Sequence, residues 1–509
     1  MKFKIKYMKH FLSFLFIVFF LHTVNAQFPV DGQYQSIAPP ITPAFPNYGE
    51  SVVDDSVPNS LKITRVTEAY NYIDENEEPQ IWYPTHEYAK TQVWNVDQTL
   101  YKISSWKVYN ATTYQEVQEL SSMYPSYWSN TDPDVIWSFR INGDIKKYNV
   151  STNTAQIVAN IPGYEFIKLG PGEGNIDIDD HYVALVGKKN NGDLDVIIFN
   201  LQTFQIENTK TFEGAWGNGN ENFPAYIDWV SISQSGNYFV INWNNGLGDI
   251  NNYYLDQLGN NHYGVEVYDS TNMQYQNRIM PYGNHGDLGY AIDGDEVYVQ
   301  FYGEYGGGTI YMHKLNGTGS TVINTHSDIG VSGHISCRNI NRPGWAYVTE
   351  SELAQSGQII AVKLDDSGLV EHFGHHFSSA LSYEQASMAV ASPNGDKICF
   401  KSDFGTDPTN SSPVSYSFFT TLSNSLSIEE ELLTNVNIYP NPIANFITIK
   451  SKDIIKSIVI YNEIGQLVKH LETQNSNDIS VSIKSLKKGF YFVQISTEKK
   501  SILKKIIKK

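Results

Sequence analysis

Cysteine is nearly absent from this sequence, which has only two, Cys337 and Cys399, in 509 residues. Two thiols are too few for the disulfide framework that holds small exported modules together. A chain of this length is instead long enough to bury a large hydrophobic core. The sequence leaves two interpretations of the pair open, a single disulfide bridge or two small buried apolar side chains.

Long apolar runs are also rare. Residues 11–21 (FLSFLFIVFFL) form one, but its eleven residues fall well short of the about 20 that a membrane-spanning helix needs. Four lysines precede this run, and Ala26 ends a small-residue cleavage site after it. The combination predicts a secretory signal peptide over residues 1–26, with an uncleaved anchor as the alternative. No later run approaches this length, so we expect no integral membrane protein.

Basic residues are scarce outside the two ends of the chain. Residues 434–509 hold thirteen lysines against five acidic residues, a formal charge of +8, and the predicted signal peptide adds +4. Because the whole chain carries −18, residues 27–433 carry −30. A body this acidic repels nucleic acids and anionic lipids, so neither is an expected partner. The alternative meaning of this charge is simple surface solubility.

The sequence motifs of several common enzyme classes are missing as well. The chain has no Gly-x-Ser-x-Gly nucleophile elbow, no His-Glu-x-x-His, no P-loop and no EF-hand loop. It also lacks the Ser-x-Asp-x-Gly-x-x-Trp box of sialidase blades. These absences disfavour a serine peptidase with a hydrolase domain and the other enzyme classes that such motifs identify.

What the chain does contain is a repeated pattern of short strands. Residues 27–60 are rich in Pro, Ser and Gly and predict an extended N-terminal arm on the surface. After them, a unit of an apolar strand, an Asx-Gly type of turn and further strands recurs seven times, at a mean step of about 49 residues. The copies start at Val93, Trp128, Ile176, Trp229, Tyr290, Arg338 and Met388.

These units predict a β-propeller. Their strands of four to seven residues are rich in Val, Ile, Tyr and Phe, and no amphipathic helix of ten residues intervenes. One small sheet cannot bury both of its faces, whereas blades packed around an axis bury them all. We therefore predict an all-β fold with a propeller of about seven blades over residues 61–425, with six or eight as alternatives.

Residues 392–403, SPNGDKICFKSD, carry a resemblance to a known group of propellers. They resemble the blades of TolB-like and oligogalacturonate-lyase-like proteins, in which a Ser-Pro-Asp-Gly turn precedes a strand ending in Ser-Asp. The resemblance lies in a repeat that many unrelated proteins share. It implies the propeller fold and offers polysaccharide lysis as one activity of such proteins.

The character of the sequence changes after Ser427. A short acidic linker over residues 426–433 leads into residues 434–509, where alternation over 446–449 and 479–483 puts one face of a small β-sandwich inward. Pro440 and Pro442 cannot donate to a strand ladder, so they interrupt the first strand at a sheet edge. The motif residues of this segment are Tyr439, Pro440, Asn441, Pro442, Gly465, Gly489 and Tyr491.

Those residues resemble the C-terminal sorting domain of proteins exported by the type IX secretion system of Bacteroidetes. The resemblance covers the whole segment from about residue 434. It implies that the signal peptide takes the chain to the periplasm, and that the secretion machinery then carries it to the outer-membrane surface or the medium. A generic carbohydrate-binding or fibronectin-like module is the alternative.

Histidines in loops between the later predicted blades are candidates for a metal site. We predict His285 and His376 as ligands of a divalent ion, manganese or calcium, with satisfied loop histidines as the alternative. Oligogalacturonate lyases hold manganese through Gln-x-x-His-x-His before the Ser-Pro-Asp-Gly turn. Gln385 matches the Gln of that run, but Met388 and Val390 replace both histidines and cannot bind a hard cation.

A second group of candidates suits an acidic sugar. Arg338 offers a guanidinium for a carboxylate, and Trp345 an aromatic face for the ring, although tryptophan in a propeller more often packs in the core. We add Glu384 and Gln385 as ligand-binding candidates, and His334 as a catalytic one beside Arg338.

Two hypotheses for the function follow. The first is a secreted or cell-surface propeller that binds a glycan or a protein through its axial face. The second is a polysaccharide lyase that abstracts a proton next to a uronate carboxylate, with His334 or His285 as base and Arg338 as the neutralising cation. Convergence of His285, His334 and His376 within about 5 Å would favour the second hypothesis.

Overall fold

The computed structural model describes most of the chain from Gly32 to Lys509. Its gaps are residue 59, residues 74–77, 105–106, 121–122, 124, 221–223, 247–252, 284, 303–308, 325–332, 351–356, 380–384, 406–414, 423–435, 440–444, 463–466, 485 and 498–500. The predicted signal peptide and linker, Glu384, Pro440, Asn441, Pro442 and Gly465 therefore lie outside the described residues. The chain divides into two compact units, residues 1–423 and 424–509.

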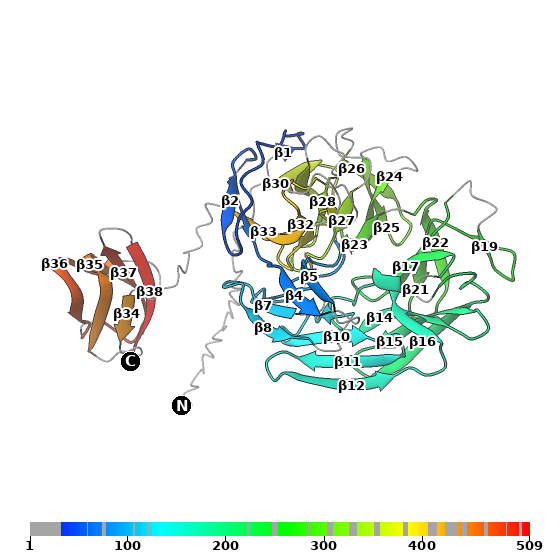
Figure 1. Ribbon diagram of the computed structural model, residues 1–509, viewed down its shortest axis with the longest axis horizontal. Coiled ribbons are helices and arrows are strands. Elements are labelled where there is room, and N and C mark those ends of the chain that lie inside the picture. The colour runs from blue at the N-terminus through cyan, green and yellow to red at the C-terminus, as the bar shows by residue number, and fades with distance from the viewer. Residues whose placement is uncertain are drawn as a thin grey trace, which may run out of the picture. The chain divides into compact units, whose positions relative to one another are not determined.

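Seven of the nine antiparallel sheets in the described part of the first unit are blades, and we number them 1 to 7 along the chain (Figure 1). Blade 1 holds β6 (Leu100–Ile103), β7 (Lys107–Asn110) and β8 (Glu116–Glu119); blade 2 holds β9 (Tyr127–Trp128), β10 (Val135–Phe139), β11 (Asp144–Asn149) and β12 (Thr154–Asn160). Blade 3 holds β13 (Phe166–Leu169), β14 (Tyr182–Lys188), β15 (Leu194–Asn200) and β16 (Gln205–Phe212); blade 4 holds β17 (Ile227–Ile232), β18 (Tyr238–Trp243), β21 (Val265–Asp269) and β22 (Tyr275–Met280). Blade 5 holds β23 (Gly286–Tyr290), β24 (Glu296–Tyr302), β25 (Thr309–Lys314) and β26 (Ser320–Asn324). Blade 6 holds β27 (His334–Ser336), β28 (Trp345–Thr349), β29 (Gln358–Lys363) and β30 (Leu369–His375); blade 7 holds β31 (Val390–Ala391), β32 (Ile398–Ser402) and β33 (Tyr416–Leu422).

Turn chemistry and apolar runs explain why these strands form. In blade 3, Asn191 and Gly192 turn the chain between β14 and β15, and Gly192 has a φ of +88°, which glycine adopts without strain. Every residue of β15 is buried. A strand in the middle of a blade is covered on both faces by neighbouring blades. Its sequence is therefore a continuous apolar run rather than an alternation of apolar and polar residues.

Hydrophobic clusters join each blade to the next and close the ring. One cluster unites blades 3 and 4, for example through Val196 and Phe239. Another unites blade 7 with blade 1 through Cys399, Phe419 and Tyr101, so the last blade packs against the first. Clusters of the same kind lie at the other five boundaries. The predicted all-β propeller is confirmed, and the described residues form seven blades.

The N-terminal residues complete the last two blades. β3 (Leu61–Arg65) pairs with β33, with Leu61 opposite Leu422, and β2 (Ser51–Asp54) pairs with β3 at the outer edge of blade 7. Figure 1 shows this meeting of chain ends, with β2 in blue beside β33 in orange. β1 (Gly32–Gln33) adds an edge strand to blade 6. Two short stretches of the predicted arm, β1 and β2, therefore form sheet edges.

Two hairpins are inserted into the repeat. β4 (Tyr70–Ile73) and β5 (Pro79–Trp82) form a two-stranded ribbon between β3 and blade 1. β19 (Tyr254–Leu255) and β20 (Asn261–His262) form another within blade 4, between β18 and β21. The repeat pattern in the sequence did not predict these strands.

The first and last strands of the blades were the hardest to predict. The repeat pattern placed the start of the third unit at Ile176, whereas blade 3 begins ten residues earlier, at Phe166 in β13. The last strands of the early blades, β8 and β12, are mostly exposed. Exposed strands carry few apolar residues, so they leave a weak periodic signal.

The C-terminal unit is a single five-stranded sheet with one buried face. Its strands are β34 (Val436–Tyr439), β35 (Phe446–Asn462), β36 (Leu467–Ser482), β37 (Gly489–Thr497) and β38 (Ser501–Lys508). Ile447, Ile449, Val481 and Ile483 are buried, as the alternation predicted. The predicted small sandwich is one hydrogen-bonded sheet because β35 is long enough to pair with β34, β36 and β37.

Candidate functional site

The residues between β5 and blade 1 cross the axis of the propeller. His86 donates its backbone N–H to Ser417 of blade 7, and Tyr88 packs edge-on against His334 of blade 6. Two residues further on, Lys90 contacts blades 3 and 4, on the other side of the ring. We call residues 83–92 the axial segment, because so short a stretch can touch opposite blades only by passing through the middle.

Lys90 forms the centre of a polar cluster on the axis. Its Nζ lies 2.6 Å from Glu173 Oε2 and 4.0 Å from the ring centroid of Trp229, and the lysine is 3% exposed. A buried ammonium is stable only with such compensation, here one carboxylate and one aromatic face. The pair joins the axial segment to the inner ends of blades 3 and 4.

Asp228, the second residue of β17, borders this cluster. Asn242 Nδ2 donates to its Oδ2 at 3.0 Å. Burial and, to a smaller extent, the Glu173 carboxylate raise the pKa of Asp228 to about 6, and Lys90 opposes this shift. A carboxyl group with this pKa exchanges protons near neutral pH, which is unusual for aspartate and is common at functional sites.

Two of the predicted histidines meet beside the axial segment. The rings of His285 and His334 stack with centroids 4.8 Å apart, at the starts of β23 and β27. His285 Nδ1 lies 3.1 Å from the carbonyl oxygen of Gly333. Burial lowers the pKa of His334 well below its usual value, with His285 and nearby lysines adding to the effect. His334 is therefore a neutral imidazole at pH 7.

Several polar atoms around the axis have no partner among the residues that the structure describes. They include Asn242 Oδ1, Gln300 Oε1, His334 Nε2 and His86 Nδ1. All four side chains are at least nine-tenths buried. Buried polar atoms without a protein partner are rare in folded proteins and mark places where water or a ligand supplies the missing bond.

Arg338 lies near this cluster but is bound to a carboxylate of its own chain. Its Nε and Nη2 donate to Asp287 Oδ2 and Oδ1, both at 3.0 Å, and Nη2 also reaches the carbonyl of Leu288. The pair is buried, with side chains 5% and 2% exposed. This geometry gives Arg338 a structural role, and its role toward a sugar carboxylate stays a prediction.

The other predicted site residues lie elsewhere in blades 6 and 7. Trp345 is 8% exposed in the core between these blades, with the Arg342 guanidinium 4.4 Å from its ring. His376 donates its backbone N–H to Gly357. Burial lowers the pKa of His376 to about 3. Gln385 is buried and donates to Asp403 at 3.1 Å. Their roles in ligand or metal binding stay predictions.

A manganese site of the lyase type does not fit the residues present. Met388 and Val390, which stand where that run has histidines, are fully buried in apolar clusters. Among the described residues, no group of three or more His, Cys, Asp or Glu side chains is placed to hold a metal ion. We therefore derive no chemistry through a metal.

Sequence reasoning missed Lys90, Glu173 and Asp228. None of them lies in a recognisable motif, and the axial segment falls between predicted units. One available signal was the long stretch from Val66 to Val93 before the first repeat, since long connections in compact domains are often functional.

Comparisons with known proteins give different matches for the two units. An oligogalacturonate lyase in complex with manganese superposes with a TM-score of 0.52 at 10% identity, over 75% of this chain and 98% of that one, which shows the shared fold alone. An oligogalacturonate lyase of Vibrio parahaemolyticus has a TM-score of 0.49 at 10% identity, over 74% and 97%. Beta-agarase A of Zobellia galactanivorans is 31% identical over 80 residues, so the chain spans only 15% of its length.

The C-terminal unit is assigned by a family match. Residues 437–509 match the model of the secretion system C-terminal sorting domain. That range holds Tyr439, which ends β34, and Gly489 and Tyr491 of β37. In the described part of the chain, no helix has the length and apolar character to cross a membrane. Residues 437–509 are thus a type IX secretion sorting domain, and the chain is an exported propeller protein of the cell surface or the medium.

Proposed function

We propose that the propeller binds a glycan at its axial face, over the axial segment and the inner ends of blades 4 to 6. The observation that carries the proposal is the ribbon β4–β5, which leads directly into the axial segment. Tyr72 and Trp82 are 40% and 38% exposed on it, with ring centroids 6.4 Å apart. An isolated two-stranded ribbon is marginally stable in water, so a bound ligand would stabilise it. Its exposed aromatic side chains are suited to contact that ligand.

Unpartnered polar atoms around the axis support the same proposal. Asn242, Gln300 and His334 each hold a buried polar atom without a described partner. Sugar hydroxyls both donate and accept, so they can satisfy atoms of either kind. Beside them, Asp228 changes its charge near pH 6, which makes the affinity depend on pH.

A polysaccharide lyase is the second candidate function. It is favoured by His334, a neutral imidazole with an unpartnered Nε2 beside His285, because a general base must be unprotonated and accessible to a proton. Arg338 would have to leave Asp287 to neutralise a substrate carboxylate. Because Arg338 is already bound to Asp287, we propose glycan binding as the main function and lyase activity as the alternative.

The test is a binding measurement on the mature full chain. Agarose, laminarin, xylan and polygalacturonate serve as probes, each in an affinity gel and in a reaction monitored for unsaturated products. We expect Trp82→Ala to weaken binding about tenfold, a loss of about 1.4 kcal/mol, whereas Tyr439→Ala, an exposed tyrosine of the sorting domain, leaves it unchanged. Retention of none of these probes would contradict glycan binding; unsaturated products would favour the lyase.

A further inference from the structure

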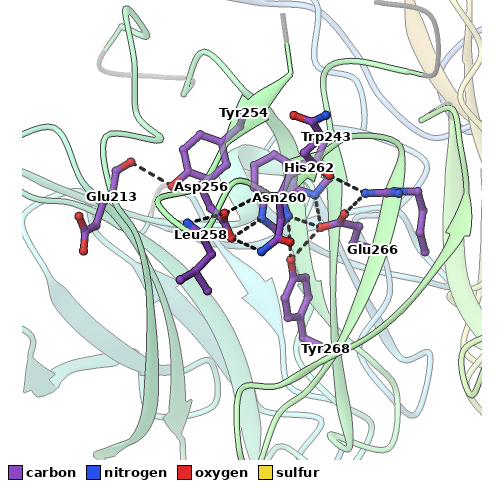
Figure 2. Close-up of polar contacts among 11 residues, drawn as sticks. Glu213, Trp243, Tyr254, Asp256, Leu258, Asn260, His262, Glu266 and Tyr268 are labelled. Atoms are coloured by element: carbon purple, nitrogen blue, oxygen red, sulfur yellow. Dashed lines mark hydrogen bonds and ion pairs between the residues drawn. The ribbon is translucent and has the colours of Figure 1, made fainter. Parts of the chain in front are cut away.

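A second concave site lies on the outside of the propeller, away from the axial segment. It is a groove of about 800 Å³ between β16 of blade 3, strands β21 and β22 of blade 4, and the inserted hairpin β19–β20. Figure 2 shows the polar network in its wall. A cavity of this volume is in the range of small-molecule and saccharide sites.

Glu266 is the fixed centre of that wall. It is 1% exposed, and its carboxylate accepts from His262 Nδ1 at 2.7 Å, Trp243 Nε1 at 2.9 Å, Tyr268 at 2.7 Å and Arg278 Nη2 at 2.6 Å (Figure 2). Burial alone would raise its pKa, but these partners lower it. A carboxylate accepts about four hydrogen bonds, so Glu266 is held in place by partners of its own chain.

Asp256 fixes the hairpin in the same way. Its Oδ1 accepts from the backbone N–H groups of Leu258 and Asn260 at 2.9 and 2.7 Å, and its Oδ2 lies 3.4 Å from His262 Nε2. His262 thus bridges the hairpin acid and the blade acid Glu266. The groove is preformed, because each charged group that closes it is held by several bonds.

Lys210 and Tyr275 are the groups that remain open. Lys210 Nζ lies 5.4 Å from the ring centroids of Phe212 and Tyr268, and no described residue makes a hydrogen bond or ion pair with it. Burial lowers the pKa of Lys210, while Asp256 and Glu266 oppose the shift from a distance. Tyr275 is 47% exposed and meets Tyr268 edge-on, 5.7 Å between centroids.

These open groups define the chemistry of the ligand. The ammonium offers up to three N–H donors, and the carboxylates of Asp256 and Glu266 stabilise its charged form without touching it. The groove therefore favours a neutral acceptor over an anion, in a propeller body of charge −30. A ring with hydroxyl oxygens and a C–H face fits the ammonium and the tyrosine together.

We propose that this groove is a second binding site, specific for an uncharged saccharide. It goes beyond the axial site, since the two lie on different surfaces and share no residue. A chain that carries both sites holds a polysaccharide at two points, so its avidity exceeds that of either site.

The proposal is tested by calorimetry on the mature full chain. The probes are the neutral hexasaccharides of cellulose, laminarin, xylan and agarose, with oligogalacturonate as the charged comparison. Lys210→Met keeps the aliphatic stem, and Tyr275→Ser removes the open ring. The matched control is Lys188→Met, because Lys188 also lies over two aromatic rings but is paired with Glu165 at 2.9 Å.

We expect a neutral hexasaccharide to bind, Tyr275→Ser and Lys210→Met to weaken it about tenfold, and Lys188→Met to leave it unchanged. Equal thermal midpoints show that the variants remain folded. The proposal is overturned if no probe binds, if both groove variants bind normally, or if oligogalacturonate binds best with strong salt dependence. Trp82→Ala separates the two sites. If only the axial proposal fails, Trp82→Ala binds with the wild-type stoichiometry and affinity, and the two groove variants weaken all of the binding that is measured.

Discussion

The guanidinium of Arg338 and the carboxylate of Asp287 form a two-point ion pair, with both N–O distances at 3.0 Å. Asp287 also accepts the backbone N–H of Cys337 at 2.7 Å. The pair links Asp287 in β23, the inner strand of blade 5, to Arg338, two residues after β27 of blade 6. It connects two blades where the sequence suggested a free cation for a substrate.

Removal of one partner of this pair is therefore expected to destabilise the propeller. Asp287→Ala leaves a buried guanidinium without a counter-charge and should cost about 3 to 5 kcal/mol of unfolding free energy, measured by urea denaturation. The exposed pair of Lys314 and Asp293 is the control, and Lys314→Ala should cost less than about 1 kcal/mol. Equal costs for both substitutions would show that the buried pair is not structural.

Asp228 predicts a pH dependence of stability. Its pKa is about 6 in the folded chain, against 3.8 for an unperturbed aspartate, so the native state binds the proton more tightly than the unfolded state. Stability is then greatest below pH 4 on account of this group and falls as the pH rises toward 6. Asp228→Asn should be more stable than wild type at pH 7, by at most about 3 kcal/mol, and the gain should vanish near pH 4.

A carboxyl group with the opposite shift supplies the control for Asp228. Hydrogen bonds from Asn260 and its neighbours outweigh burial and lower the pKa of Asp256. Asp256→Asn should therefore lose stability at pH 7 and not at low pH. Thermal melts of both variants across pH 4 to 8 that show the same slope would contradict the assignment.

Closure of the ring by β3 predicts a large effect of a small substitution. Ile63 is fully buried in the cluster between blades 6 and 7, so Ile63→Ala should cost about 2 to 5 kcal/mol through lost burial and a cavity. Val53 of β2 is 55% exposed, and Val53→Ala should change stability by less than about 0.5 kcal/mol. Calorimetric unfolding would compare the two, and a similar small change for both would argue against closure through β3.

The two cysteines should behave as unreactive thiols. Both are buried and free, and burial raises the pKa of each thiol. Because the thiolate is the reactive form, a thiol reagent should label neither in the native protein and both after unfolding. Mass spectrometry under non-reducing conditions gives the decisive control, since a mass two units lower would indicate a disulfide.

The prediction of the fold from sequence worked where the residue pattern is local. Turns such as Asn191-Gly192 and apolar runs such as those of β14 and β15 can be recognised from a few neighbouring residues. These patterns were enough to predict a propeller of about seven blades. The strands β12 and β8 gave little signal because they face water. The pairing of β3 with β33 joins residues some 350 positions apart, which no local pattern encodes.

The candidate site was predicted only in part. His285 and His334 were singled out as loop histidines, and they do stack against each other. Arg338 was expected to face a ligand, but the position of Asp287 fifty-one residues earlier decides its partner. Lys90 had no signal in its sequence surroundings, because its importance comes from Glu173 and Trp229 on distant blades.

The fold class, the repeat and the sorting domain could be predicted from the amino-acid sequence, because strand periodicity, turn residues and short motifs act over a few neighbouring positions. The pairing of charges, the exposure of aromatic rings and the path of the axial segment became known with the folded structure. Those properties depend on contacts between blades. A side chain such as Lys210 becomes a candidate binding group only when folding brings aromatic rings beneath it and leaves its N–H donors open.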